Sequence, residues 1–206
     1  MFNSFFKAIF AGVMIMIGCT VNLMCDNKYV GSVMFGTGLL SIVIFQMKLF
    51  TGKVGYLVTE HKLRNIGELA IILCGNAVGT LAAGTMIKWT RFYSSIQGKV
   101  STLTEAKLND NVISILFLAF FCGILMYVAV EGYARTKSPF IIILPVAVFI
   151  LSGFEHCVAN MAYFTMAEAW SVNAILYTGL MILGNAAGSI VTALISRVLS
   201  KKEVSV

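Results

Sequence analysis

The segments IILCGNAVGT (Ile71–Thr80) and LMILGNAAGS (Leu180–Ser189) repeat one pattern within a single chain. Each consists of an apolar run, Gly-Asn-Ala, a small residue, a second Gly and a hydroxyl residue. Two earlier segments, FAGVMIMI (Phe10–Ile17) and FFCGILMY (Phe120–Tyr127), are also loosely alike. Small residues let helix backbones approach closely in a membrane, so we interpret the glycines as packing residues. The pattern indicates an internal duplication, with repeats at about residues 1–90 and 108–200.

The composition is typical of an integral membrane protein. Of the 206 residues, 59% are hydrophobic and 12% are charged, whereas soluble domains have roughly a quarter charged residues. Six apolar stretches are long enough to cross about 30 Å of hydrocarbon as helices. The predicted spans are Phe5–Leu23, Val30–Phe50, Ile66–Ile87, Val112–Val130, Phe140–Phe164 and Val172–Ile195. Their connections are mostly short, so residues 1–206 are predicted to form one transmembrane domain.

Two of these spans are interrupted. The second contains FQMKLFTGKVGY (Phe45–Tyr56) and the fifth contains SGFEHCVANM (Ser152–Met161). We expect Gly52 and Gly153 to break the two helices. Irregular backbone at membrane depth is tolerated where it lines a cavity or is buried in protein. The two interruptions therefore predict broken helices around a site inside the membrane.

The order of the spans determines how the two repeats are oriented. Each unit has three helices, an odd number, so the second unit starts on the opposite side of the membrane and lies inverted relative to the first. Inverted repeats of this kind place a binding site near the membrane midplane. The sequence therefore predicts an all-α transport protein with six transmembrane helices in two inverted three-helix repeats, the second and fifth helices being broken.

The net charge of +6 reflects basic residues at the ends of the predicted spans, as the positive-inside rule expects. If the spans alternate, the basic residues that share one side are Lys7, Lys62, Arg64, Arg135, Lys137, Arg197, Lys201 and Lys202. The other side has Lys28 and a longer loop from Lys88 to Asn111. We expect a multi-pass protein of the cytoplasmic (inner) membrane with both termini in the cytoplasm, in contact with lipid and not with nucleic acid.

Two ionisable residues, Glu155 and His156, lie within the fifth span. An ionised group at the bilayer centre costs about 2.5–3.5 kcal/mol on insertion scales, so such groups usually face a cavity or a partner. Burial favours the neutral imidazole, which can donate a hydrogen bond or a proton to a small anion. The alternative is a structural histidine whose ring is bound by Glu155 or by Asn160, one turn later. Adjacent helical residues point about 100° apart, so we assign Glu155 a structural role, capping backbone amides or pairing with a lysine.

Other chemistry has little support in the sequence. The five cysteines are used as small hydrophobic residues, and there is no metal-ligand spacing, nucleophile triad or phosphate loop. We therefore expect neither an enzyme nor a metal or other cofactor. His61 and Lys107 are interpreted from the pattern alone as solvated loop residues. Two alternative functions are a channel for a neutral solute such as water, glycerol or ammonia, and a membrane enzyme that uses Glu155 and His156 as an acid–base pair.

Several motifs resemble the formate/nitrite transporter family. They are AGVMIMIG (Ala11–Gly18), LFTG (Leu49–Gly52), GNAVG (Gly75–Gly79), LPVAVFILSGFEHCVANM (Leu144–Met161) and LGNAAG (Leu183–Gly188). The resemblance covers all spans except the fourth, in the family's order. It implies an aquaporin-like, six-helix pore, assembled as a homopentamer with one pore per subunit. The family conducts small monovalent anions such as formate, nitrite and hydrosulfide, and in some members lactate.

The resemblance also implies site residues. His156 corresponds to the family's central pore histidine, Asn160 to its companion, and Thr51 to the threonine that faces the histidine. A lysine before the fourth span attracts anions in the family. Lys107 takes this position if the loop before Pro139, after the fourth span, is shorter here than in the family. The residues that fall where the family builds two apolar constrictions are Phe35, Leu39, Leu49, Phe50 and Phe149.

The chain also departs from the family pattern. Its sequence begins almost at the first span, so we do not transfer the pH-dependent gating attributed to the family's N-terminal amphipathic helix. Gly123 stands where some formate channels have a pore asparagine, so their selectivity is not transferred either. We expect a channel for small weak-acid anions, with formate first and proton coupling through His156; a nitrite or hydrosulfide channel is the alternative within the family.

Overall fold

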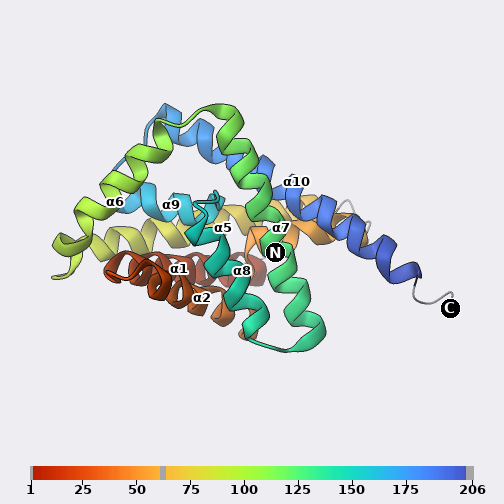
Figure 1. The fold of residues 1–206 in the computed structure, drawn as a ribbon. Coiled ribbons are helices and arrows are strands. Elements are labelled where there is room, and N and C mark those ends of the chain that lie inside the picture. The colour runs from red at the N-terminus through yellow and green to blue at the C-terminus, as the bar shows by residue number, and fades with distance from the viewer. Residues whose placement is uncertain (1, 61–63, 203–206) are drawn as a thin grey trace.

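The computed structural model describes residues 2–60 and 64–202, and its regular structure over these residues is helical. Four continuous helices are long and apolar enough to cross a membrane, and they contain the predicted first, third, fourth and sixth spans. They are α1 (Phe2–Met24), α5 (Arg64–Lys88), α7 (Val112–Thr136) and α10 (Val172–Lys202) (Figure 1). Large apolar side chains such as Phe10, Phe117 and Leu183 are exposed on them, as expected for helices that face lipid.

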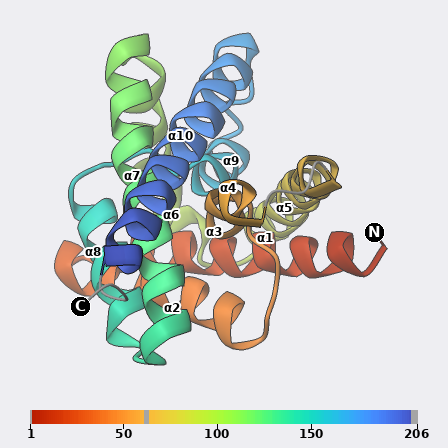
Figure 2. The same ribbon diagram turned by 90° about the vertical axis from the view of Figure 1, so that its right-hand side faces the viewer.

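The predicted second and fifth spans are each built from separate helices. The second, predicted as Val30–Phe50, contains α2 (Lys28–Ile44) and continues past its predicted end through α3 (Phe50–Lys53), the short 3₁₀ helix η1 (Val54–Tyr56) and α4 (Leu57–Glu60). The fifth consists of α8 (Phe140–Leu151) and α9 (Cys157–Met166). Figure 2 shows α3, α4 and α9 near the centre of the molecule, where α3 and α9 contact both α5 and α10, and α4 contacts α10. The two breaks therefore lie inside the protein, as predicted.

The two breaks are made differently from one another. Gly153 adopts a φ of +68° in the fifth span and breaks that helix, as expected. The expectation for Gly52 is wrong, because Gly52 lies within α3 and the chain turns earlier, at Gln46 with a φ of 52°. A Cβ atom on Gly52 would lie 3.2 Å from Cγ2 of Val130. Gly52 therefore allows α3 to pack closely against α7.

The repeated glycines form equivalent close contacts in the two halves. A Cβ on Gly79 would lie 2.1 Å from the carbonyl oxygen of Ile9, and one on Gly188 would lie 2.0 Å from that of Phe120. Real side chains do not fit at such distances, so the glycines permit α5 to pack on α1 and α10 to pack on α7. This confirms the interpretation of these glycines as packing residues.

One connection differs from the prediction. The segment from Lys88 to Asn111, predicted as a loop, contains the helix α6 (Tyr93–Leu108). The Tyr93 hydroxyl donates to the carbonyl oxygen of Met166 and joins the start of α6 to the end of α9. Lys107 consequently lies in the last turn of a packed helix. His61 and Lys62, expected in the turn after α4, lie outside the described residues.

Candidate functional site

Two buried asparagines hold the broken spans in place, and the first is Asn76 in α5. Its Oδ1 accepts the backbone N–H of Phe50 at 2.9 Å. Its Nδ2 donates to the carbonyl oxygens of Lys48, at 2.9 Å, and Ala8, at 2.8 Å. The side chain is fully buried, and it satisfies backbone groups that the break between α2 and α3 leaves without helical partners.

Asn185 in α10 makes the same set of contacts in the second repeat. Its Oδ1 accepts the N–H of Cys157 at 2.9 Å, and its Nδ2 donates to the carbonyl oxygens of Glu155, at 2.7 Å, and Ala119, at 2.8 Å. Interpreting the Gly-Asn-Ala segments as packing alone missed this role. The available signal was a polar amide at the same place in two apolar helices.

These contacts define which residues correspond in the two repeats. The carbonyl oxygens of Lys48 and Glu155 each accept a hydrogen bond from Nδ2 of the repeated asparagine, so Leu49 in the first repeat corresponds to His156 in the second. Both of these residues have extended backbone and directly precede a helix, α3 and α9 respectively. Equivalent backbone thus carries a leucine in one break and a histidine in the other.

The position of His156 before α9 determines its tautomer. Its Nδ1 accepts the backbone N–H of Ala159 at 3.1 Å, and an amide N–H can only donate. The neutral ring therefore carries its proton on Nε2, which lies 2.8 Å from Oγ1 of Thr51 in α3. Both side chains are about 1% exposed. The structure thus brings together, through a buried hydrogen bond, the two residues that the family resemblance places face to face.

Asn160 does not orient the imidazole as expected, because both ring nitrogens have other partners. Its Nδ2 donates to Oε2 of Glu155 at 2.7 Å and to the carbonyl oxygen of His156 at 3.0 Å. Its Oδ1 is buried and accepts no hydrogen bond from the described residues. Asn160 therefore binds the backbone of the break and leaves one acceptor available.

Glu155 pairs with a lysine, which is one of the two structural roles considered from the sequence. Its Oε2 accepts from Nζ of Lys107 at 2.6 Å as well as from Asn160. The side chains of Lys107 and Glu155 are only 10% and 4% exposed. The interpretation of Lys107 as a solvated loop residue is wrong, because α6 carries it inward to this carboxylate.

A small cavity of about 60 Å³ opens beside these groups. Lys107, His156, Asn160 and Phe149 contribute to its wall, together with Gly153. The ring of Phe149 stacks on the imidazole of His156, with centroids 5.7 Å apart. Its other neighbour is Phe35, edge to face at 5.5 Å. The Phe35–Phe149 pair therefore forms an apolar barrier next to the polar cavity.

A larger cavity of about 370 Å³ lies at the first break. Leu39 and Leu49 line it, and both are 2% exposed or less. Thr51 lines neither cavity, but the next residue, Gly52, lines the larger one and its partner His156 lines the small one. Four of the predicted constriction residues form two groups, which we call the apolar pairs: Phe35 packs against Phe149, and Leu39 and Leu49 both line the larger cavity. Phe50 lines neither cavity: it belongs to the buried core, and its backbone N–H donates to Asn76.

The described residues contain no group of three or more His, Cys, Asp or Glu side chains placed to hold a metal ion. The five cysteines in this part of the chain are free thiols: Cys19, Cys25, Cys74, Cys122 and Cys157. The polar groups that the structure places at the site are a lysine–carboxylate pair, an amide acceptor and an imidazole donor.

Comparison with known proteins identifies relatives of the chain. A family model described as formate/nitrite transporter matches residues 1–199. The formate channel FocA of Haemophilus influenzae is 29% identical over 169 residues, which cover 70% of this chain and 58% of that protein. FocA of Escherichia coli K12 is 29% identical over 182 residues, with 77% and 64% covered. The nitrite transporter NirC of the same organism is 28% identical over 144 residues, with 65% and 54% covered. The chain thus spans under two thirds of the length of these relatives.

Solved structures show the same fold. A structure described as a pentameric formate channel with formate bound superposes with a TM-score of 0.76 at 22% identity, covering 99% of this chain and 97% of that chain. A structure described as an FNT family ion channel gives a TM-score of 0.79 at 23% identity, with 96% and 88% covered. These matches confirm the predicted all-α membrane fold with its broken second and fifth spans.

Proposed function

Since the chain belongs to the formate/nitrite transporter family, we propose that it conducts small monovalent weak-acid anions, and formate in particular, through the pathway between the two cavities. The observation that carries the proposal is the buried contact of Thr51 with His156, 2.8 Å long: His156 stacks on Phe149 of one apolar pair, and Thr51 follows two residues after Leu49 of the other. An uncompensated anion is prohibitively costly among apolar side chains, so a donor at this point is what a narrow anion pathway requires.

Lys107 attracts the anion into the small cavity. An ammonium group has three donor positions, and its bond to Glu155 uses one of them. Low-dielectric walls focus the field of a charge, which raises the local concentration of the opposite ion. The free Oδ1 of Asn160 accepts the hydroxyl of the protonated acid. The small cavity therefore suits both forms of a weak acid.

His156 acts next, as a donor from Nε2. Because Nδ1 is engaged by the N–H of Ala159, the ring does not gain a second proton without losing that bond. The neutral ring therefore serves as a hydrogen-bond donor from Nε2, and the anion takes its proton from a hydronium ion of the solution, HCOO⁻ + H₃O⁺ → HCOOH + H₂O, so that the imidazole and Thr51 end the step unchanged. The acid then passes the apolar pairs without charge.

Transport by proteoliposomes tests this function. Formate uptake is measured for the wild type and for His156→Ala, with the same variant tested for nitrite and hydrosulfide at two pH values. We expect uptake in the wild type and a loss of at least tenfold in the variant. Uptake at the wild-type rate in His156→Ala would refute the proposal. The comparison of the three anions is needed because the relatives named for formate and nitrite are 29% and 28% identical to the chain.

We also propose that the protein is a homopentamer in the cytoplasmic membrane with both termini in the cytoplasm. The pentameric channel with the same fold supports the assembly, and the basic residues at the ends of the spans support the orientation. Native mass spectrometry in detergent measures the subunit number. Accessibility of a cysteine or tag placed at either terminus in intact cells measures the orientation.

A further inference from the structure

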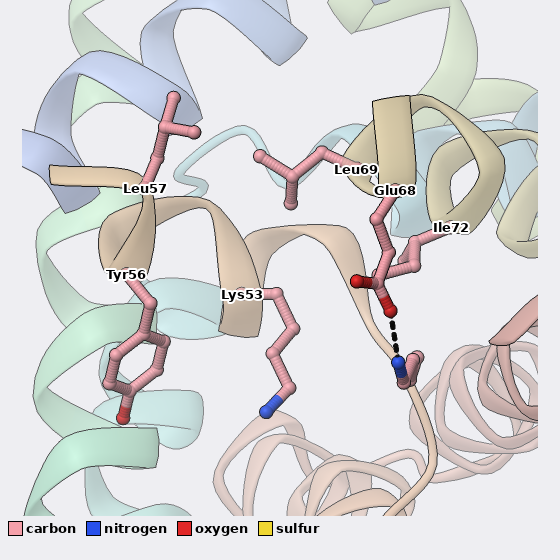
Figure 3. A pocket seen from close by; sticks show the side chains of 7 residues that line it. Lys53, Tyr56, Leu57, Glu68, Leu69 and Ile72 are labelled. Carbon is pink, nitrogen blue, oxygen red and sulfur yellow. Dashed lines mark hydrogen bonds and ion pairs between the residues drawn. The ribbon is translucent and has the colours of Figure 1, made fainter. Parts of the chain in front are cut away.

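We propose that the pocket in Figure 3 is a second anion-binding site, in which a small monovalent oxyanion such as formate replaces Glu68 as the counter-ion of Lys48. The pocket has a volume of about 230 Å³ and lies between α5 and the segment that follows the first break. The inference rests on the proposed function, because it places the site at the end of the pathway opposite Lys107.

Lys48 occupies the junction between this pocket and the pathway. It lines both the 230 Å³ pocket and the 370 Å³ cavity, and the next residue is Leu49 of the apolar pair. Its backbone is fixed, because its carbonyl oxygen accepts from Asn76 at 2.9 Å and its N–H donates to the carbonyl oxygen of Lys7 at 3.3 Å. An anion held by Lys48 is therefore next to Leu49, one of the predicted constriction residues.

The charges around this junction favour an anion. The residues that line the two cavities include three lysines, Lys7, Lys48 and Lys53, against one carboxylate, Glu68, so two positive charges are in excess. In Figure 3 Lys53 extends into the space between Tyr56 and Glu68, and the dashed line marks the ion pair of Glu68 with Lys48. Glu68 pairs with Lys48, so among the lining residues no second carboxylate is present for Lys7 and Lys53.

In the internal repeat, Lys48 has the place in the first half that Glu155 has in the second, although their ion-pair partners Glu68 and Lys107 come from helices that do not correspond, α5 and α6. Lys48 and Glu155 occupy equivalent positions, each bound through its carbonyl oxygen by the repeated asparagine. The polarity is reversed, because the break supplies the lysine in the first repeat and the carboxylate in the second. Each mouth of the pathway therefore has one lysine–carboxylate pair beside its apolar barrier.

The Lys48–Glu68 pair is the more easily exchanged of the two. The side chains of Lys48 and Glu68 are 26% and 37% exposed, against 10% and 4% for Lys107 and Glu155. Water screens exposed ion pairs and makes them weak, whereas a buried pair is costly to separate. Ser4 accepts from Nζ of Lys48 at 2.9 Å and donates to Glu68 at 2.9 Å. Lys48 thus keeps one partner when the carboxylate of Glu68 is displaced.

Binding of ¹³C-formate to the detergent-solubilised chain, followed by NMR at low ionic strength, tests the site. Lys48→Gln should weaken the binding about tenfold, since one charge contact near a protein surface is worth about that much. Glu68→Gln should strengthen it, because the competing carboxylate is gone. Lys99→Gln, on an exposed lysine paired with Asp26, is the matched control and should change nothing. A shift in the same direction for Lys48→Gln and Glu68→Gln, or no shift in either, overturns the proposal.

The double variant Lys48→Glu with Glu68→Lys separates anion binding from a structural ion pair. It restores the pair with reversed polarity, so a purely structural role predicts wild-type binding. We expect weakened binding, because the lysine then projects from α5 and a carboxylate stands beside Leu49. Formate uptake measured in parallel distinguishes the two proposals. If the wild type takes up formate but no variant changes formate binding, the second site is refuted and the proposed function is not. If wild-type liposomes take up no formate, the proposed function is refuted, and the binding data still test the pocket.

Discussion

Replacing Asn185 with leucine tests whether one buried amide holds the break in the fifth span. The substitution removes the acceptor of the Cys157 N–H, at 2.9 Å, and the donor to the Glu155 carbonyl oxygen, at 2.7 Å. Cys157 begins α9, so its N–H has no partner within that helix. A buried backbone group left unsatisfied costs about 1–3 kcal/mol, and two such groups cost about 2–6 kcal/mol. The carbonyl of Ala119 adds little, because it lies inside α7 and keeps its helical partner.

Circular dichroism melting in detergent and formate uptake in liposomes measure the result. We expect Asn185→Leu to lower the melting temperature clearly and to abolish uptake, because His156 follows directly on the released carbonyl. Thr192→Val on the same helix is the control: its hydroxyl donates only to the carbonyl of Gly188, one turn away, so its effect should stay within about 0.5 kcal/mol. A variant at Asn185 that melts and transports like the wild type would show that the break does not depend on the amide.

The remaining predictions concern the donor pair and the packing glycines. Thr51→Val removes the partner of Nε2 of His156 and leaves a buried N–H unsatisfied at a cost of about 1–3 kcal/mol, so formate uptake should fall about tenfold or more while the protein still purifies as a folded species. Uptake equal to that of the wild type contradicts a role of Thr51 in the anion pathway. Gly188→Ala puts a Cβ 2.0 Å from the carbonyl oxygen of Phe120 and should destabilise by about 1–3 kcal/mol or more, whereas Gly179→Ala, with open space around it, should be neutral or stabilise by up to about 1 kcal/mol. Melting temperatures of the two glycine variants check this, and equal shifts would contradict it.

The long-range organisation could be predicted from the sequence because it rests on features that the sequence repeats. The apolar runs gave the four continuous helices, and the repeated Gly-Asn-Ala segments gave the pairing of like helices. Gly153 could be identified as a helix breaker because only glycine adopts its φ of +68° at no steric cost. Each of these signals can be recognised from residue types alone: apolarity over the length of a span, a repeated motif, or a glycine inside an apolar segment.

The parts that the sequence did not predict depend on tertiary contacts. Gly52 has the residue type of a helix breaker, but the contact with Val130 decides its role. Lys107 reads as a loop residue until α6 carries it to Glu155, which is 48 positions away in the sequence. The tautomer of His156 follows from the backbone N–H of Ala159, which is buried and has no helical partner because α9 begins just before it. No pattern of residue types specifies these partners.

The two repeats share a scaffold but divide the chemistry between them. Asn76 and Asn185 fix both breaks with the same three kinds of bond, so the positions of Leu49 and His156 are equivalent in backbone and differ in side chain. A histidine at both positions would place two donors in one constriction, and a leucine at both would leave none. The partner of His156 comes from Thr51, two residues after Leu49 on the opposite repeat. A single histidine donor at this point therefore requires the two repeats to differ in side chain at equivalent positions of the break.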